Sequence, residues 1–438
     1  MKAISGVTLL VTCAALAFGA ATILPVRDAD ADARYDRFVR DFWASARKAG
    51  ISRKTYDAAF AGLSPDPKVI EKNAYQPEFK LPPSQYVVAA VTDTRVKVGR
   101  EMLEKYKTEL DEIEKRWGVD RHVLLAIWGM ETNFGTFMGS MNVIRSLSTL
   151  AYKGRRARFG RSELIAALRM MERGVVPEGP MMGSWAGAMG HTQLLPSNYL
   201  RFSVDFDKNG KRDIWNTPYE ALASTANFLA RQKWTTGKTW GYEVKLPSRV
   251  GAGYAGRKRS RSLGKWAALG VKRVNGSGFP RAGDRAYLYL PMGTKGPAFL
   301  LLNNFRVIMR YNAAHTYALS VGHLADRIRG GDPFVRPWPD GARALTEDER
   351  YEIQRRLTVR GHDIGVLDGV LGSKTRAAIR ALQKEKGLKV DGFPTPKIIE
   401  VLRAEAETAS TSVPPTPASA PPANTGAPPV STNAPKAN

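Results

Sequence analysis

One uninterrupted apolar run constrains the fold of this chain more than any other feature. Residues 123–130 carry no charged side chain, and they end at Glu131, directly before the polar turn-forming residues 132–135. Asp120 precedes the run as a candidate helix N-cap, and Gly118 ends the helix before it. A helix that is apolar on all sides has to be buried. We therefore expect a helical core, with Glu131 where the buried helix ends.

Glu131 is the first candidate for a chemical role. Poor hydration at the end of an apolar helix disfavours the ionised carboxylate and raises its pKa. An acid that stays protonated near neutral pH can protonate a glycosidic oxygen. From the residues alone, two other interpretations stay open: a surface residue at the end of a structural helix, and a metal ligand. The chain's five histidines are scattered singly, so nothing nearby would complete a metal site.

The N-terminus predicts export. Residues 1–31 combine a lysine, an apolar run and small-residue cleavage sites, as in a secretory signal peptide, with an uncleaved signal anchor as the alternative. The only cysteine, Cys13, lies in this segment. Without it the protein has no cysteine, so its stability must come from a large core. We expect an exported protein, membrane-anchored if the segment is retained.

The net charge favours an anionic partner. The chain has 66 basic and 41 acidic residues, a formal charge of +25, with local density at residues 155–158 and 257–261. No zinc-finger spacing or RNA-recognition signature accompanies this charge, and export argues against nucleic acid, so we expect no nucleic-acid partner. An acidic lipid surface and a carboxylate-bearing polymer both stay open. We expect a monomer.

The organisation of the chain indicates an α+β fold that is predominantly helical. Helical spacing is clear over residues 86–116, 162–173 and 220–234. Two apolar segments flanked by Gly and Pro, 287–291 and 298–302, predict strands of a minor sheet. We place the main domain at residues 33–332.

A second, smaller domain follows a proline-rich linker at residues 333–344. Residues 345–404 predict three helices, opened by a capping box at 346–349, by Ser373 and by Thr395 before a proline. The turns 368–369 and 391–392 resemble each other, which suggests a faint internal repeat. Residues 405–438 are rich in Pro, Ala, Ser and Thr, so we expect a disordered tail.

A second constellation, residues 184–197, is rich in small residues that allow close approach of a substrate. Ser184 and Gln193 supply hydrogen bonds suited to sugar hydroxyl and N-acetyl groups. A tight helix-packing turn is the alternative. We expect His191 to be incidental rather than catalytic.

The acidic loop 205–213 matches the first half of an EF-hand, with oxygen ligands at alternate positions and a glycine at the sixth. The acid expected at the twelfth position is replaced by Asn216, and Glu220 follows four residues later. A longer, weaker calcium loop and a metal-free acidic turn both stay open.

These segments resemble one known family as a set. The motifs are Glu131-Thr-Asn-Phe-Gly, the 184–197 segment, the acidic loop with Asp213-Ile-Trp-Asn, and Asn304-Phe-x-Val-Ile-x-Arg-Tyr-Asn. They occur in the order seen in the membrane-bound lytic murein transglycosylase B family, and the match covers residues 35–332. The resemblance implies a lysozyme-like fold that cleaves the β-1,4 bond between N-acetylmuramic acid and N-acetylglucosamine. Residues 345–402 resemble a small three-helix peptidoglycan-binding domain.

The resemblance also implies roles for individual residues. Glu131 matches the catalytic acid of the family. The implied substrate-binding residues are Tyr86, Ser184, Gln193, Tyr311 and Asn312. The implied calcium ligands are Asp205, Asp207, Asn209, the Lys211 carbonyl and Glu220. Two positions depart from the family: Leu194 replaces a binding aromatic, and Phe228 replaces a site tyrosine. We expect these changes to affect subsite affinity through a lost stacking surface and a lost hydroxyl.

The implied chemistry needs one carboxyl group and no cofactor. Glu131 would protonate the bridging oxygen and then, as a base, take the proton of the muramic acid C6 hydroxyl, which closes a 1,6-anhydro ring. An intramolecular nucleophile has a high effective molarity, so no second carboxylate is obligatory. The alternatives are a hydrolytic muramidase with a second carboxylate and a non-catalytic wall-binding protein. Peptidoglycan is the expected partner, and its peptide stems carry carboxylates that suit a basic protein.

Overall fold

The computed structural model describes residues 29–74, 81–153, 156–175, 179–339, 341–343, 345–369, 371–390 and 392–411. It divides into two compact units: residues up to 82 together with 90–335, and residues 83–89 together with 336 onward. Residues 1–28 of the predicted signal segment lie outside the described residues. Among the helices that are described, none is both long and apolar enough to cross a bilayer.

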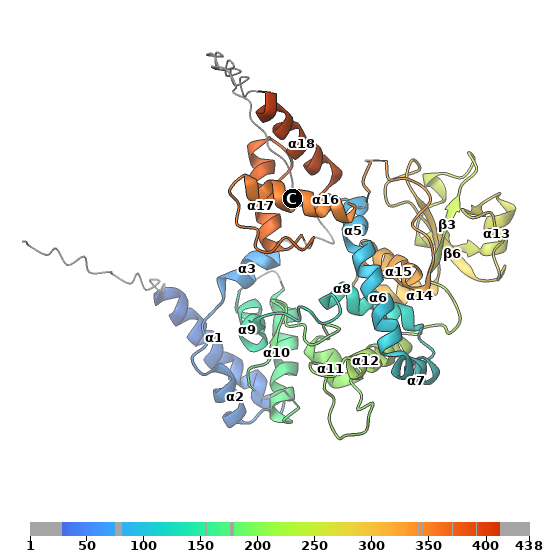
Figure 1. Cartoon of the computed structure of the whole chain (residues 1–438). Coiled ribbons are helices and arrows are strands. Elements are labelled where there is room, and N and C mark those ends of the chain that lie inside the picture. The colour runs from blue at the N-terminus through green and yellow to red at the C-terminus, as the bar shows by residue number, and fades with distance from the viewer. Residues whose placement is uncertain are drawn as a thin grey trace, which may run out of the picture. The chain divides into compact units, whose positions relative to one another are not determined.

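The first unit is mostly helical, as predicted (Figure 1). Its helices before the sheet are α1 (Ala29–Lys48), α2 (Arg53–Phe60), α3 (Pro67–Ala74), α6 (Asp93–Lys105), α7 (Lys107–Trp117), α8 (Arg121–Thr132), α9 (Val143–Tyr152), α10 (Ala157–Glu172), α11 (Pro196–Phe202) and α12 (Pro218–Arg231). After the sheet come α14 (Asn303–Tyr311) and α15 (His315–Arg329). Large apolar side chains of α1, α2, α9 and α10 form one core cluster.

The helical pattern over residues 86–116 is divided among three helices rather than one. α5 (Pro83–Ala90) ends before Thr92, whose hydroxyl caps α6 by accepting from the Arg95 backbone N–H at 3.2 Å. Tyr106 then leaves the helical conformation, with φ −110° and ψ 27°, and separates α6 from α7. Helical spacing continues across both breaks, so the sequence pattern did not reveal them.

α8 is the buried helix that the apolar run predicted. The Asp120 carboxylate accepts from the His122 backbone N–H at 2.9 Å, which confirms it as the N-cap. Gly118 ends α7 in the left-handed conformation at φ 66°. Seven consecutive residues, 123–129, are buried in α8, and α15 packs along it. The apolar run therefore forms the centre of the unit.

A small antiparallel sheet completes the first unit, and Figure 1 shows its strands grouped with the short helix α13 (Leu263–Ala268). The strand order is β4-β6-β7-β3-β5, and the strands are β3 (Gly241–Lys245), β4 (Arg261–Ser262), β5 (Lys272–Arg273), β6 (Arg285–Tyr289) and β7 (Ala298–Leu301). β6 and β7 pair in the register Leu288 to Leu300. Both predicted strands are thus confirmed. A separate two-stranded pair joins β1 (Met141–Asn142) to β2 (Met182–Gly183).

The second unit contains the three predicted helices, α16 (Glu347–Val359), α17 (Ser373–Glu385) and α18 (Pro396–Thr411). The capping box is present: Thr346 Oγ1 accepts from the Glu349 N–H, and Glu349 Oε2 accepts from the Thr346 N–H. The internal repeat also has a structural basis. A buried glutamine carbonyl accepts from a turn glycine twice, Gln354 from Gly369 at 2.8 Å and Gln383 from Gly392 at 2.7 Å.

Two predictions in this unit were wrong. The N-cap of α17 is Gly372, so Ser373 is the first helical residue instead of the cap. α18 continues to Thr411, past residue 405, where the sequence placed the start of the tail. Alanine and glutamate are good helix formers, so the helix outlasts the last aliphatic residues. Residues 412–438 lie outside the described residues.

Candidate active site

Glu131 lies in the last turn of α8, where the buried helix reaches the protein surface. Its side chain is partly exposed, whereas the residues before Met130 and the following Thr132 are buried. The structure therefore places the carboxylate where the apolar helix ends, as the sequence predicted.

Tyr317 holds this carboxylate, and sequence reasoning missed it. The Tyr317 hydroxyl donates to Glu131 Oε1 at 2.6 Å from α15. Its ring is buried, with 3% of the residue exposed, so the hydroxyl has little freedom to move. A hydrogen bond to a carboxylate is short and strong, and it fixes the orientation of the acceptor. Only the packing of α15 along α8 reveals the contact, because 186 residues separate the two side chains.

The turn after Glu131 has an unusual backbone. Asn133, Phe134 and Gly135 all adopt positive φ angles, of 49°, 58° and 85°. This conformation is costly for a bulky residue such as phenylalanine, and it persists only where packing enforces it. The buried Phe134 ring packs edge-on against Trp128 at 5.6 Å and covers Gly129, where a Cβ would lie 2.7 Å from the ring. The apolar face of α8 therefore holds the turn.

The 184–195 segment docks against this turn. Thr132 Oγ1 donates to the His191 carbonyl at 2.6 Å, and Gln193 Nε2 donates to the Met138 carbonyl at 2.9 Å. Gly135 has no side chain to obstruct the approach, because a Cβ there would lie 2.5 Å from the His191 ring. The first two constellations of the sequence are thus neighbours in space.

His191 has a structural position, which agrees with the prediction that it is not catalytic. Its Nδ1 accepts from Trp128 Nε1 at 3.2 Å, so this nitrogen is unprotonated. Burial lowers the pKa of His191 to about 4, although the charge of Asp213 opposes the shift. A neutral imidazole therefore joins the loop to the core.

Ser184 and Gln193 each keep one polar group for a ligand. Ser184 Oγ accepts from the Ala188 N–H at 3.0 Å, which leaves its O–H to donate. The Gln193 amide nitrogen also donates to the Gly190 carbonyl at 3.0 Å. Among the described residues nothing donates to its carbonyl oxygen. One donor and one acceptor are thus available beside the Glu131 turn.

Tyr311 connects three elements next to Glu131. Its hydroxyl donates to the Thr192 carbonyl at 2.5 Å, and its ring meets Phe228 edge-on at 5.3 Å. Burial raises the pKa of Tyr311, and the negative charge of Glu131 adds to the shift, so the two groups are close. Asn312 ends α14, and its Oδ1 accepts from the Ala314 N–H at 3.1 Å. The structure thus brings Glu131, Gln193 and Tyr311 together.

The two departures from the family have different consequences. Leu194 lies in the hydrophobic core with 1% of its surface exposed, so this position offers no surface for stacking. A buried leucine without a stacking surface is consistent with the loss expected at this position. Phe228 is buried between Phe202 and Tyr311, which is consistent with loss of a hydroxyl beside Tyr311.

Tyr86 is the one predicted site residue that belongs to the second compact unit. It lies on α5, and residues 83–89 belong to the second unit. The structure therefore does not bring Tyr86 together with Glu131 inside one unit, and its role stays a prediction.

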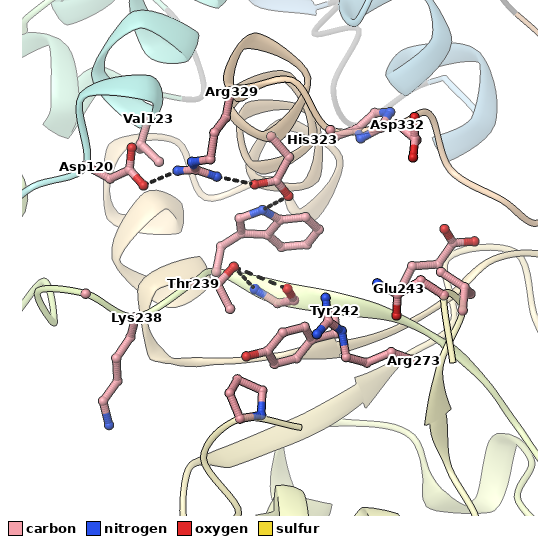
Figure 2. Close-up of a pocket in the computed structure, with 18 of the residues that line it drawn as sticks. Asp120, Val123, Lys238, Thr239, Tyr242, Glu243, Arg273, His323, Arg329 and Asp332 are labelled. Carbon is pink, nitrogen blue, oxygen red and sulfur yellow. Dashed lines mark hydrogen bonds and ion pairs between the residues drawn. The ribbon is translucent and has the colours of Figure 1, made fainter. Parts of the chain in front are cut away.

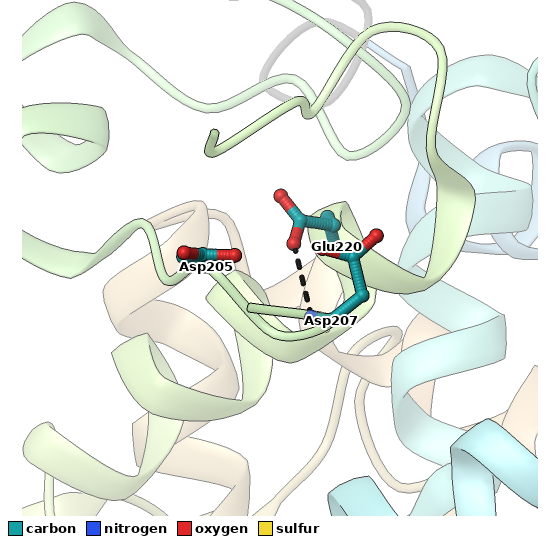
Figure 3. A group of neighbouring side chains, drawn as sticks. All are labelled: Asp205, Asp207 and Glu220. Carbon is teal, nitrogen blue, oxygen red and sulfur yellow. Dashed lines mark hydrogen bonds between the residues drawn. The ribbon is translucent and has the colours of Figure 1, made fainter. Parts of the chain in front are cut away.

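The acidic loop gathers three of its carboxylates at one point (Figure 3). Oxygens of Asp205, Asp207 and Glu220 all lie within 4.8 Å of one another. Glu220, fully buried on α12, accepts backbone N–H groups of Phe206 and Asp213, both at 2.7 Å. Burial nevertheless raises the pKa of Glu220. Asp205 Oδ1 is buried and has no hydrogen-bond partner in the described part of the chain.

These features suit a calcium ion. Calcium binds carboxylate and carbonyl oxygens, and a buried oxygen without a donor is a position where a cation would lower the free energy. Asn209 Oδ1 instead accepts from the Lys211 N–H at 2.8 Å. The carboxylates therefore fit the predicted site better than Asn209 does.

A cavity of about 690 Å³, part of whose wall Figure 2 shows, is lined by residues other than Glu131 and its turn. Its wall includes Asp120, the N-cap of α8, and a helix of this length is about 17 Å long. Four of the side chains that line it form one polar network. Arg329 bridges Asp120 and Asp326, and Trp240 Nε1 donates to Asp326 at 2.9 Å. The cavity and the Glu131 site thus lie at opposite ends of α8.

Comparison with known families identifies the first unit. Residues 34–326 match the family described as transglycosylase SLT domain. The chain belongs to this transglycosylase family. All the predicted catalytic, substrate-binding and calcium positions lie within the matched stretch. Residues 346–402 match a second family, described as putative peptidoglycan binding domain.

Solved members of the transglycosylase family share the fold. SltB3 from Pseudomonas aeruginosa, in complex with NAG-NAM-pentapeptide, is 46% identical over 84% of this chain and 99% of that chain, with a TM-score of 0.68. The same protein has been solved with NAG-anhNAM-pentapeptide. Escherichia coli Slt35 in complex with calcium is 25% identical over 69% of this chain and 94% of that chain, with a TM-score of 0.58.

A curated relative, membrane-bound lytic murein transglycosylase B of Escherichia coli (strain K12), is 30% identical over 244 residues. The alignment covers 54% of this chain and 65% of the relative. The predominantly helical, lysozyme-like transglycosylase fold predicted from the sequence is confirmed.

Proposed function

We propose that this protein is a lytic transglycosylase that cleaves peptidoglycan between N-acetylmuramic acid and N-acetylglucosamine and leaves a 1,6-anhydro end. The observation that carries the proposal is the position of Glu131 at the exposed end of a buried helix, held by Tyr317. Membership of the transglycosylase family and the anhydro sugar bound by SltB3 support it.

In this proposal one carboxyl group acts twice. Glu131 donates its proton to the bridging oxygen as the bond from that oxygen to C1 of the muramic acid breaks. The resulting carboxylate takes the proton of the C6 hydroxyl, and O6 bonds to C1. The new bond closes within one sugar, so its high effective molarity replaces a positioned water. The donor of Ser184, the acceptor of Gln193 and the neighbouring Tyr311 and Asn312 would hold the sugars, with Tyr86 as a further binding residue.

The carboxylates of the acidic loop and Glu220 are engaged by backbone groups, which favours a mechanism without a second carboxylate. Glu220 on α12 accepts backbone N–H groups of the acidic loop, and Asp213 accepts those of Trp215 and Asn216, both at 2.9 Å. These carboxylates stabilise the loop instead of serving a water molecule.

Replacement of Glu131 by glutamine tests the assignment. We expect Glu131→Gln to lower release of anhydro-muropeptides by roughly 10²–10⁴-fold, because general acid–base catalysis contributes about that much. Glu112→Gln, at an exposed position of α7, removes the same charge and should leave the rate unchanged. Digestion products are identified by mass spectrometry, and co-sedimentation with murein checks that binding persists.

The products separate this proposal from its alternatives. Reducing-end muramic acid from the wild-type protein would establish a hydrolytic muramidase. Binding to murein without any released muropeptide would establish a wall-binding protein without activity.

We also propose a structural calcium ion in the acidic loop, held by Asp205, Asp207 and Glu220, with Asn209 and the Lys211 carbonyl as the remaining ligands from the family resemblance. The clustered oxygens and the unpartnered Asp205 Oδ1 support it.

Calcium binding should raise the stability of the folded protein. At a Ca²⁺ concentration about 100-fold above Kd we expect roughly 2.7 kcal/mol of stabilisation and a Tm rise of about 5 °C. Mg²⁺ at the same concentration should act less, and Asp205→Asn should remove the response. An unchanged Tm of the folded wild-type protein on adding Ca²⁺ after chelation would refute the site.

The roles proposed for the second unit and for the N-terminal segment follow from the same function. The second unit would hold the enzyme on the wall and raise the effective concentration of substrate without adding a catalytic contact. A peptidoglycan substrate implies a periplasmic protein, whose N-terminal segment 1–31 is either removed or kept as an anchor. Cell fractionation with and without salt distinguishes the two.

A further inference from the structure

A second hollow, of about 380 Å³, lies between the sheet and the start of α14. Strands β6 and β7, the turn before β4 and the first residues of α14 contribute to its wall. It is separate from the larger cavity at the far end of α8, although Lys238 borders both. The residues argued below are Arg257, Arg285, Tyr287 and Arg306.

The hollow is strongly positive. Four cationic side chains line it, Lys238, Arg257, Arg285 and Arg306, against one carboxylate, Asp284. Asp284 is already paired with Lys238 at 2.5 Å and with Arg281 outside the hollow at 3.1 Å. Among the described residues, none of the three arginines forms an ion pair. The hollow therefore has positive charge that the protein itself does not neutralise.

The first turn of α14 adds to this field. Leu302 is the N-cap of the helix, and its side chain cannot accept a hydrogen bond from the exposed backbone N–H groups. Leu302, Asn303 and Asn304 line the hollow beside Arg306. The start of a helix carries a partial positive charge, so it favours the same kind of ligand as the arginines.

The arginines share the wall of the hollow with Tyr287. Burial raises the pKa of Tyr287 to about 12, whereas the charges of Arg257 and Arg306 both oppose the shift. Both guanidinium groups therefore lie within electrostatic reach of the Tyr287 hydroxyl. Arg285 Nη2 donates to the Ser260 carbonyl at 2.7 Å, which orients its guanidinium group on the same rim.

The helix α14 connects the hollow with the Glu131 site. Its first residues line the hollow, and its last residue, Tyr311, bonds to Thr192 beside the Glu131 turn. A helix of nine residues is about 14 Å long. A five-residue peptide in extended form spans at most about 17 Å, so a peptide attached to a sugar at Glu131 can reach this far.

We propose that this hollow binds carboxylate groups of the peptide stem attached to the muramic acid, and that the enzyme thereby prefers glycan chains that carry stems. The inference rests on the proposed function and identifies which part of peptidoglycan the enzyme reads. Arginine binds carboxylates through paired N–H groups, so Arg257 and Arg306 are the recognising residues, with Arg285 in support.

The test compares two substrates. Wild-type enzyme digests murein with intact stems and murein whose stems have been removed by an amidase, and kcat/KM is measured for each. We expect a preference for stem-bearing chains that falls about fivefold in Arg257→Gln/Arg306→Gln, because exposed ion pairs contribute modestly. The preference should also weaken with added salt.

The 3₁₀ turn at Arg257 supplies a matched control. Lys258→Gln/Arg259→Gln removes the same net charge from exposed positions of that turn, and neither residue lines the hollow. We expect this control to keep the wild-type preference. An equal loss in both double variants would mean that general charge attraction is responsible, and it would overturn the inference.

Competition identifies the anion. A free stem peptide should inhibit digestion of stem-bearing chains, and the same peptide with amidated carboxylates should inhibit less. Inhibition by inorganic phosphate with no difference between the two peptides would assign the hollow to phosphate and overturn the stem proposal.

The rates on the two kinds of murein separate this inference from the proposed function. A wild-type enzyme that releases anhydro products from both substrates at equal rates would refute this inference alone. Release of no anhydro product from either substrate would refute the proposed function.

Discussion

The Tyr317 hydroxyl donates to Glu131 Oε1 at 2.6 Å, and the two side chains belong to helices that pack along each other. At the scale of single residues, the apolar run before Glu131 was enough to select it from the sequence. The sequence did not identify Tyr317, because one tyrosine among fifteen has no local signature. A contact across 186 residues depends on packing, which no spacing rule describes.

Removal of this one hydroxyl should lower the rate more than it lowers binding. A hydrogen bond to a charged group is worth about 1.5–3 kcal/mol, so we expect Tyr317→Phe to lower kcat by about 10- to 100-fold. Sedimentation with murein should stay close to wild type. Tyr56→Phe is the matched control, because this buried tyrosine also donates at 2.6 Å, to the Val39 carbonyl of the N-terminal helices. An unchanged kcat for Tyr317→Phe would remove Tyr317 from the site.

At the scale of elements, α8 and its turn act together. Residues 133–135 hold three successive positive φ angles because the Phe134 ring packs onto Gly129. The sequence predicted where the helix begins and ends, since caps and apolar runs are local signals. The conformation of Phe134 could not be predicted, because it is imposed by tertiary contacts.

Gly129→Ala tests this coupling. Alanine normally stabilises a helix relative to glycine by about 0.5–1 kcal/mol. Here its Cβ would lie 2.7 Å from the Phe134 ring, so we expect a loss of about 1–3 kcal/mol in the free energy of unfolding and reduced activity. Denaturant unfolding measures the change. In a Phe134→Leu background the cost should be smaller, and an equal cost in both backgrounds would rule out the contact as its cause.

At the scale of the whole molecule, Arg329 connects distant segments of the first unit. It pairs with Asp120 at the start of α8 and with Asp326 on α15, and Asp326 also accepts from Trp240 at the start of the sheet (Figure 2). Burial raises the pKa of Asp326, whereas Arg329 opposes that shift. Burial also acts to raise the pKa of Asp120, but His122 and Arg329 outweigh it and lower the value.

The stability of Arg329→Gln should therefore depend on pH. A carboxyl group with a raised pKa costs stability at pH values above that pKa, and loss of Arg329 increases the cost for Asp326. Loss of Arg329 also reduces the stability that the lowered pKa of Asp120 contributes above its unfolded value. We expect the variant to lose about 1–2 kcal/mol at pH 7, because Arg329 is partly exposed, and less as the pH falls and both carboxyl groups gain protons. Urea unfolding at pH 7 and pH 4 checks the sign, and a loss that grows toward pH 4 would contradict it.

The sequence by itself determined the elements and the family. Apolar periodicity, caps and turn residues act over a few positions, so they predicted α8, both strands, the three C-terminal helices and Glu131. The acidic loop was visible for the same reason, because its oxygens are close in sequence.

Only the tertiary structure decided which side chains from distant segments meet. It placed Tyr317 on the carboxylate, buried Leu194 in the core, grouped the segment around Tyr86 with the second unit, and gathered Arg257 and Arg306 around one hollow. The physical reason is that side-chain contacts between distant segments depend on how helices and strands pack, and packing is a property of the whole fold.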